Sequence, residues 1–92
     1  MIVRLMGDGQ YELDSRHLDE MNRIDNNIVK IVMKGDERAF RAEFRKLVDY
    51  VRRNGKKLPD EVIKPSDVIV PPVDLTLEEA REIFKGDGLI PG

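Results

Sequence analysis

Two segments with helical periodicity are separated only by the dipeptide Gly35-Asp36, and this spacing constrains the fold more than any other feature of the chain. Glycine commonly ends helices and aspartate commonly caps the next one, so the dipeptide marks a stop and a start. A connection this short favours antiparallel packing of the two helices. The sequence therefore predicts a helical hairpin over residues 14–54, with Asp14 or Ser15 as the first N-cap and Gly55 as the final stop. Its apolar positions are Leu18, Met21, Ile24, Ile28, Ile31 and Val32, followed by Phe40, Phe44, Leu47, Val48 and Val51.

The segment before this hairpin has the pattern of paired strands. Met1 to Met6 places Val3 and Leu5 on one face of an extended chain and Ile2, Arg4 and Met6 on the other. Gly7-Asp8-Gly9 then leads into a second extended run, Gln10 to Leu13. Tight hairpin loops need residues that accept positive φ, and glycine does so at no steric cost. We expect an antiparallel β-hairpin here and no dinucleotide-binding loop, because a third glycine and an immediate helix are missing.

The last third of the chain is rich in proline and has no long helical pattern. Its prolines exclude a regular helix between Lys56 and Pro72, and Ser66 to Val70 has the pattern of a third, edge strand. Thr76 and Glu79 have the spacing of a capping box, which predicts a short final helix ending before Gly86. The fold class is therefore α+β: a β-hairpin, an antiparallel helical hairpin, a Pro-rich segment with a third strand and a short C-terminal helix, in one domain over residues 1–92.

Composition excludes several classes of function. With no Cys and one His, the 92-residue chain lacks the residues for disulfides, thiolate zinc sites, iron–sulfur clusters or His-rich metal sites, and we expect no cofactor. Its apolar runs are far shorter than the roughly 20 residues of a membrane span. A domain this small buries only about 60 to 65% of its unfolded surface, which makes homo-oligomerisation a natural supplement. The high charge and the absence of Cys and Trp resemble thermophile compositions.

Charge is concentrated in the middle of the chain. Residues 1–37, 38–57 and 58–92 have formal charges of −3, +6 and −5, which sum to the net charge of −2. On a helical wheel, Arg38, Arg41, Arg45 and Arg52 fall within about 60° of one another, opposite the apolar face. Four interpretations remain open: a solvated face with i,i+4 pairs such as Glu37 to Arg41, a contact with an acidic partner protein, a contact with anionic lipid, and a contact with nucleic acid. The acidic net charge disfavours the last, and we expect no nucleic-acid partner.

Four further positions are candidates for a specific role. Asp25 falls inside the apolar arc of its helix, where a carboxylate is paired, lies at the edge, or has a perturbed pKa. We expect a structural, buried polar role, with a recognition contact as the alternative. His17 lies in a first helical turn near Asp14 and is expected to make a local polar contact, not a catalytic one. Leu89 and Ile90 are unusually apolar for a chain end and predict docking, onto this domain or onto a partner.

Taken together, several segments resemble one known family. They are Met1–Tyr11, Leu18–Asn22 with Ile24–Asn26, Pro65–Pro72 and Gly88–Gly92. Over its whole length the chain is similar to the PspA-associated protein A family, small domains encoded beside PspA, the coiled-coil membrane-stress protein of the phage-shock system. The resemblance implies no catalytic residue. It implies a regulatory or adaptor role in the envelope-stress response, with a PspA-like protein as partner, in the cytoplasm and, through that partner, at the inner face of the membrane.

On this basis, we expect a non-catalytic protein that binds a PspA-like coiled coil. Arg38, Arg41, Arg45 and Arg52 are the expected partner contacts, because a row of guanidinium groups suits a long charged helical rod. Leu89 and Ile90 are the expected apolar anchors. The rival hypothesis is a small homo-oligomeric domain that binds an anionic ligand or a membrane surface through the same arginines. An enzyme remains a third, remote class.

Overall fold

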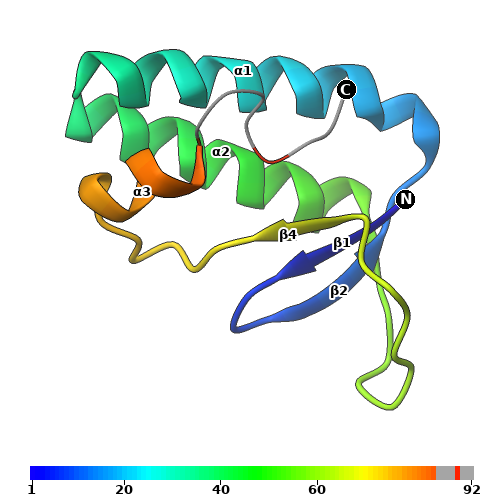
Figure 1. The fold of residues 1–92 in the computed structure, drawn as a ribbon. Coiled ribbons are helices and arrows are strands. Elements are labelled where there is room, and N and C mark those ends of the chain that lie inside the picture. Colours follow the sequence, from blue (N-terminus) through cyan, green and yellow to red (C-terminus); the bar gives the residue numbers. More distant parts are fainter. Residues whose placement is uncertain (85–88, 90–92) are drawn as a thin grey trace.

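The computed structural model describes residues 1–84 and Leu89, and Figure 1 shows their arrangement. Two long helices lie side by side over a small sheet, and a short third helix closes one end. The sheet has four strands in the order β3-β2-β1-β4. In chain order the elements are β1 (Ile2–Leu5), β2 (Gly9–Glu12), η1 (Ser15–His17), α1 (Leu18–Lys34), α2 (Glu37–Asn54), β3 (Lys56–Lys57), β4 (Val68–Val70) and α3 (Leu77–Ile83). The predicted α+β fold class is confirmed.

The helical hairpin forms as predicted, and its turn shows why. Gly35 ends α1 in the left-handed conformation, with φ of 76°, and its amide donates to the carbonyls of Ile31 and Val32. The side chain of Asp36 then caps α2 by accepting a hydrogen bond from the Ala39 amide at 3.0 Å. These two residues provide hydrogen-bond partners for backbone groups at the end of α1 and at the beginning of α2. The chain therefore reverses direction at once, and the helices pack antiparallel.

The start of the first helix differs from the prediction. Residues 15–17 form a 3-10 turn, and the α-helix begins only at Leu18. Asp14 is the cap of this turn, because its side chain accepts from the Arg16 amide at 3.0 Å and its carbonyl accepts from the His17 amide at 3.1 Å. The second bond spans three residues and not four, and this spacing defines the tighter helix.

The end of α2 also differs from the usual glycine stop. Gly55 is extended, with φ of −91°, so its left-handed freedom is not used. A side chain is excluded there for another reason: a Cβ would lie 2.7 Å from the carbonyl oxygen of Val51 and 2.9 Å from Cδ1 of Leu13. Glycine at this position permits the end of α2 to approach the segment that follows β2.

The strands assemble around β1. It pairs antiparallel with β2, as the hairpin pattern predicts, with Val3 opposite Tyr11 and Leu5 opposite Gly9. The third predicted strand is present as β4, an edge strand that runs parallel to β1. The sequence did not predict β3, because a Lys-Lys pair has no strand pattern of its own. This strand exists because residues 56 and 57 pair with β2.

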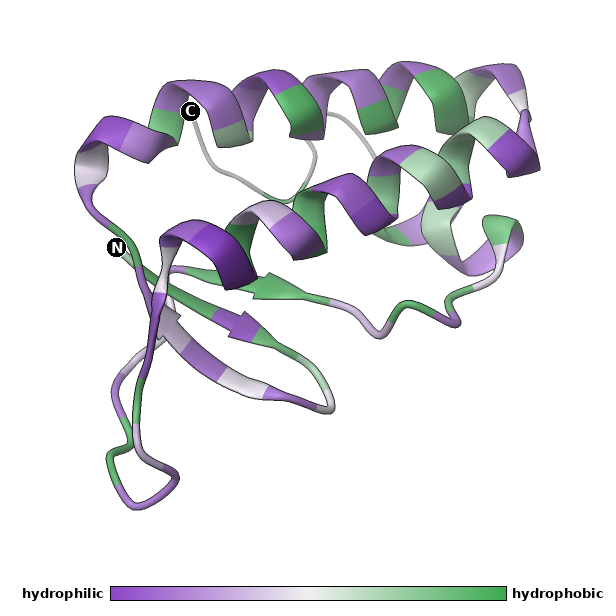
Figure 2. Cartoon of the chain, turned by 180° about the vertical axis from the view of Figure 1, so that it is seen from behind, coloured by the Kyte–Doolittle hydropathy of each residue, from purple (hydrophilic) through white to green (hydrophobic). Residues whose placement is uncertain are grey.

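The core lies between the helices and one face of the sheet. Val3, Leu5 and Val68 are buried there, beneath the apolar faces of α1 and α2. Bands of hydrophilic and hydrophobic residues alternate along both helices in Figure 2, as expected for amphipathic helices covering a core.

The short helix α3 joins the core through an aromatic cluster. The Phe84 ring, at the end of α3, meets the rings of Phe40 and Phe44 edge-on, with centroids 6.1 and 6.0 Å away. The predicted capping box is present: the Thr76 hydroxyl accepts from the Glu79 amide, and the Glu79 carboxylate accepts from the Thr76 amide. The predicted stop at Gly86 lies outside the described residues.

Candidate functional site

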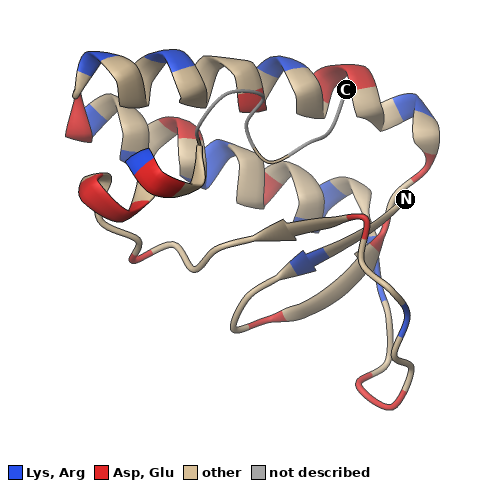
Figure 3. Cartoon of the chain, viewed as in Figure 1, with Lys and Arg blue, Asp and Glu red and all other residues tan. Residues whose placement is uncertain are grey.

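The four arginines predicted for partner contact all lie on α2, with exposed side chains, away from the apolar face of the helix. We call Arg38, Arg41, Arg45 and Arg52 the arginine face. Figure 3 shows Lys and Arg positions distributed along α2, whereas acidic residues mark the beginning of α3 and the tip of the loop between β3 and β4. The surroundings of the four guanidinium groups differ, and these differences divide the arginine face into parts with different roles.

Arg52 is engaged inside the domain. Its Nε donates to Oδ2 of Asp8 at 3.0 Å, which ties the end of α2 to the turn between β1 and β2. Asp8 also accepts from Nζ of Lys57 at 3.0 Å and from the hydroxyl of Tyr11 at 3.0 Å. The hydrogen bond from Lys57, together with those from Arg52 and Tyr11, lowers the pKa of the Asp8 carboxyl below its ordinary value, although partial burial opposes the shift. Arg52 therefore has a structural partner that the sequence pattern did not reveal.

Arg41 has only a weak partner. Its Nη2 lies 3.3 Å from Oε1 of Glu37, one turn earlier on the same helix, and both side chains are about half exposed. Exposed pairs of this spacing contribute about 0.3 to 0.5 kcal/mol to helix stability. A partner that offers a carboxylate of its own displaces such a contact at little cost.

Arg38 and Arg45 have no ion pair with any residue that the structure describes. Both side chains are exposed. Their guanidinium groups therefore keep all their hydrogen-bond donors available to solvent or to a ligand.

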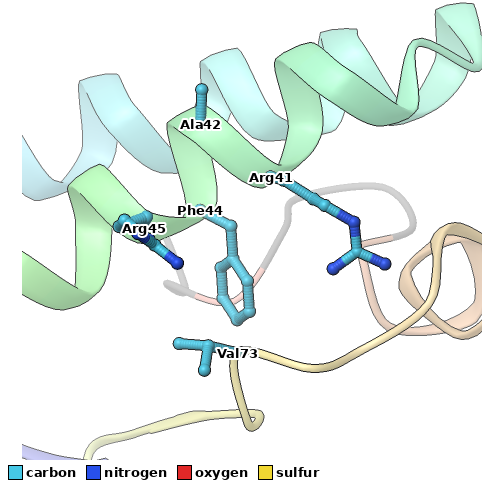
Figure 4. A pocket seen from close by; sticks show the side chains of 5 residues that line it. All are labelled: Arg41, Ala42, Phe44, Arg45 and Val73. Atoms are coloured by element: carbon cyan, nitrogen blue, oxygen red, sulfur yellow. The ribbon is translucent and has the colours of Figure 1, made fainter.

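A hollow of about 230 Å³ lies between Arg41 and Arg45. Figure 4 shows these two side chains extending on either side of the Phe44 ring, with Val73 below it. Phe44 is 1% exposed, whereas Val73, in the loop between β4 and α3, is 51% exposed. The hollow thus combines two guanidinium groups with an exposed apolar side chain. Chemically, it suits a carboxylate or phosphate oxygen that arrives beside an apolar group.

A second, more open hollow of about 450 Å³ continues along the outer side of α2. Ala42 and Arg45 line both hollows, so the two form one continuous surface. The second hollow adds Lys46 and Arg53 to the positive charge. Its lining residues are Ala42, Arg45, Lys46, Asp49, Tyr50 and Arg53. Sequence reasoning missed Val73 and this extension, because only the folded chain brings Val73 beside α2.

The other predicted positions lie elsewhere. Asp25 is buried, at 1% exposed, and its Oδ1 accepts a hydrogen bond from the Leu89 amide at 3.1 Å. Leu89 packs against the core of its own domain. Ile90 lies outside the described residues. Asp25 and Leu89 are therefore joined to each other and are separate from the arginine face.

His17 makes a contact that the sequence did not indicate. We expected a local polar contact near Asp14, but Nδ1 of His17 lies 2.7 Å from the hydroxyl of Tyr50 on α2. The two rings are nearly perpendicular, with centroids 5.6 Å apart. This contact joins the beginning of α1 to α2. Within residues 1–84 and Leu89, no group of three or more His, Asp or Glu side chains is placed to hold a metal ion.

No helix in the described part of the chain combines the length and the hydrophobicity that crossing a membrane requires. Comparison with known proteins gives one match. The model of a family described as PspA-Associated protein, PspAA, matches residues 1–92, the whole chain. No curated protein and no solved structure matches it.

Proposed function

The chain belongs to the PspA-associated protein family, and from this premise we propose that it is a non-catalytic adaptor of the membrane-stress response that binds a PspA-like coiled-coil protein through the arginine face of α2. The family description supports the link to PspA. The contact surface is inferred from the geometry of α2. Arg38, Arg41 and Arg45 are the proposed contacts, and Arg52 is left out because Asp8 already holds it.

The main support for this proposal is the hollow between Arg41 and Arg45. The two residues are four positions apart, which separates their backbones by about 6 Å along the helix axis. Acidic side chains at i and i+4 on a partner helix have the same spacing, so two helices lying side by side match one guanidinium to one carboxylate per turn. Val73 supplies an apolar contact beside these charges. A charged helical rod with an apolar residue between acidic ones is the partner that fits.

The expected affinity is modest. An exposed ion pair contributes roughly 0.2 to 1 kcal/mol, whereas a micromolar complex requires about 8 kcal/mol of binding free energy. Two or three such pairs therefore account for only part of the affinity. The apolar contact at Val73 and the surface continuing toward Tyr50 must supply the rest. Binding that combines both kinds of contact weakens with added salt but survives it.

The rival function uses the same arginines for an anionic ligand or a membrane surface, in a small homo-oligomeric protein. Arg38 and Arg45 make no ion pair among the described residues, and guanidinium groups bind phosphate as readily as carboxylate. Lipid binding of this kind depends almost entirely on charge. It is expected to disappear at moderate ionic strength, where a protein complex with an apolar contact persists.

Size-exclusion chromatography with light scattering, on the protein alone and mixed with the PspA-like protein of the same genome, tests the proposal. The wild type should co-elute with the partner at low and moderate salt. The variant Arg41→Glu/Arg45→Glu should not. The matched control is Arg16→Glu/Lys30→Glu, which changes the net charge equally at exposed positions outside α2 and should bind like the wild type.

Two results would contradict the proposal. One is co-elution that the reversal at residues 41 and 45 leaves unchanged. The other is no complex at any salt concentration, together with binding to vesicles that contain an anionic phospholipid. The second result would favour the rival function.

A further inference from the structure

The face of the sheet that is turned away from the helices carries an exposed apolar patch. Register places Ile69 of β4 beside Arg4 of β1, and Met6 follows Arg4 by two positions on the same face. Ile69 is 55% exposed and Met6 is 47% exposed. The loop between β3 and β4 adds Val62 and Ile63, which are 37% and 82% exposed. We call these four residues with Arg4 the outer-face patch.

Arg4 lies within this patch without an ion pair to any residue in the described part of the chain. Its side chain is half-buried, and it lines a small hollow of about 60 Å³ together with Val62, Ile63 and the acidic Asp60, with which it makes no ion pair. A half-buried guanidinium group attracts a carboxylate more strongly than a fully exposed one does, because less water screens the two charges.

The loop that completes the patch is fixed to the sheet. The side chain of Gln10 on β2 is buried, and its amide nitrogen donates to the Lys64 carbonyl and to the Ser66 hydroxyl. In return, the Lys64 amide donates to Oε1 of Gln10 at 3.2 Å, and the Leu58 amide donates to the Gln10 carbonyl at 2.9 Å. The loop therefore presents Val62 and Ile63 on a preformed surface, which lowers the entropy cost of binding.

The same loop carries two acidic residues, which have the charge opposite to that of Arg4. Asp60 and Glu61 are exposed beside the apolar pair, and neither makes an ion pair within residues 1–84. Figure 3 shows the loop tip as acidic and β1 with a basic position. The outer-face patch and the loop beside it therefore carry one cation without an ion pair, two such anions and exposed apolar side chains. A surface with both signs complements itself under two-fold symmetry.

We propose that the occupant of the outer-face patch is a second copy of this chain. In the resulting dimer, Arg4 of each copy pairs with Asp60 or Glu61 of the other, and Val62 and Ile63 of each loop pack against Met6 and Ile69 opposite. The proposal goes beyond partner binding and does not depend on it. The arginine face belongs to the helix layer, so two sheets that meet at their outer faces leave it accessible on both copies.

The dimer is expected to be weak. Four strands about 4.8 Å apart and two to four residues long give a sheet of at most roughly 20 by 13 Å, and the loop extends it on one side. A stable complex buries about 800 Å² on each partner, and this face offers less. We expect a reversible dimer with a dissociation constant of roughly 10 μM to 1 mM. If the proposed function also holds, even a weak dimer presents two arginine faces and gains avidity for a repetitive partner.

Analytical ultracentrifugation of the full chain alone, over a concentration series spanning roughly 10 μM to 1 mM, tests this surface by charge exchange. Arg4→Glu places acidic residues opposite each other at both contacts, and Asp60→Lys/Glu61→Lys places basic residues opposite each other. Each variant alone should dimerise at least tenfold more weakly than the wild type. Mixed together, the two should form a heterodimer at least as readily as the wild type forms its dimer, because every contact then joins opposite charges. A variant that merely failed to fold would not be rescued by mixing.

Arg16→Glu is the matched control, because it changes the net charge as much as Arg4→Glu does, at an exposed position outside the outer-face patch, and it should dimerise like the wild type. Three results would overturn the proposal: a wild type that remains monomeric throughout the series, charge-reversed variants that dimerise as strongly as the wild type, or a mixture of the two variants that forms no heterodimer. Since no PspA-like protein is present, none of these results bears on the proposed function.

Discussion

Replacing Asp8 by Ala should destabilise the domain, because one carboxylate joins three elements. Asp8 lies in the turn between β1 and β2, and its oxygens accept from Arg52 at the end of α2, from Lys57 of β3 and from the Tyr11 hydroxyl, each at 3.0 Å. Alanine suits the backbone at this position, since positive φ is confined to glycines among the described residues. The measured loss therefore reports on the side chain alone.

The magnitude follows from the exposure of the partners. Arg52 and Lys57 side chains are both 49% exposed, so each pair contributes only about 0.2 to 1 kcal/mol. Tyr11 is buried, and leaving its hydroxyl without a partner costs about 1 kcal/mol. The sum is about 2 kcal/mol of unfolding free energy. For a domain of this size that corresponds to a Tm lowered by roughly 8 to 16 °C.

The pH dependence identifies the carboxylate as the cause. Hydrogen bonds from Lys57, Arg52 and Tyr11 lower the pKa of Asp8 in the folded state. A carboxyl group whose pKa is lowered in the folded state stabilises the fold fully at pH values above its unfolded pKa of about 3.9. This stabilisation is lost as the pH falls through the folded-state pKa. Urea unfolding should therefore show the full difference in unfolding free energy between wild type and Asp8→Ala at neutral pH. This difference should become smaller below about pH 4.

A double-mutant cycle with Arg52→Gln completes the test. This substitution should cost at least about 0.5 kcal/mol less when Asp8 is already alanine, because the two side chains interact directly. The assignment of Arg52 to a structural role would be refuted by either of two results. One is a difference in unfolding free energy between wild type and Asp8→Ala that is as large at pH 2.5 as at pH 7, and the other is a loss of unfolding free energy on Arg52→Gln that is equal with Asp8 and with Ala at position 8.

Three further substitutions test the remaining contacts by urea unfolding. Asp25→Ala should cost about 1 to 3 kcal/mol and speed hydrogen exchange at the Leu89 amide, which loses its acceptor; unchanged exchange would show that the bond is not formed in solution. Phe84→Ala should cost about 3 to 5 kcal/mol, because it empties a site among buried rings, and a loss below 1 kcal/mol would mean that α3 does not dock as described. Thr76→Ala should cost about 1 kcal/mol through the lost cap, whereas Thr76→Ser should be nearly neutral.

Local signals made much of the fold predictable. The turn at Gly35 and Asp36, the β-hairpin and the capping box of Thr76 each depend on residues within a few positions of one another, and all are present. The strand β3 and the parallel pairing of β4 with β1 depend on partners far away in the chain, and periodicity says nothing about them. Gly55 shows the same limit: the sequence indicated the stop, but the crowding by Leu13 appears only in the folded chain.

The candidate site was predictable in outline and not in detail. A helical wheel places Arg38, Arg41, Arg45 and Arg52 on one side of α2, because that geometry is local. The wheel cannot show that Arg52 meets Asp8, which lies 44 positions away, or that Val73 completes a hollow with Arg41 and Arg45. These long-range contacts separate the arginine that supports the fold from those that we propose for binding.

The central claim is that the arginine face of α2 touches the PspA-like partner, and site-directed crosslinking tests it most directly. The chain has no cysteine, so a single Cys carries a photo-crosslinker at one chosen position. Ala42→Cys places it at an exposed position that lines both hollows, and Asn26→Cys places it at an exposed position on α1 as a control. We predict adducts with the PspA-like protein from residue 42 and none from residue 26. Adducts from residue 26 alone, or a stable complex with no adduct from residue 42, would contradict the account.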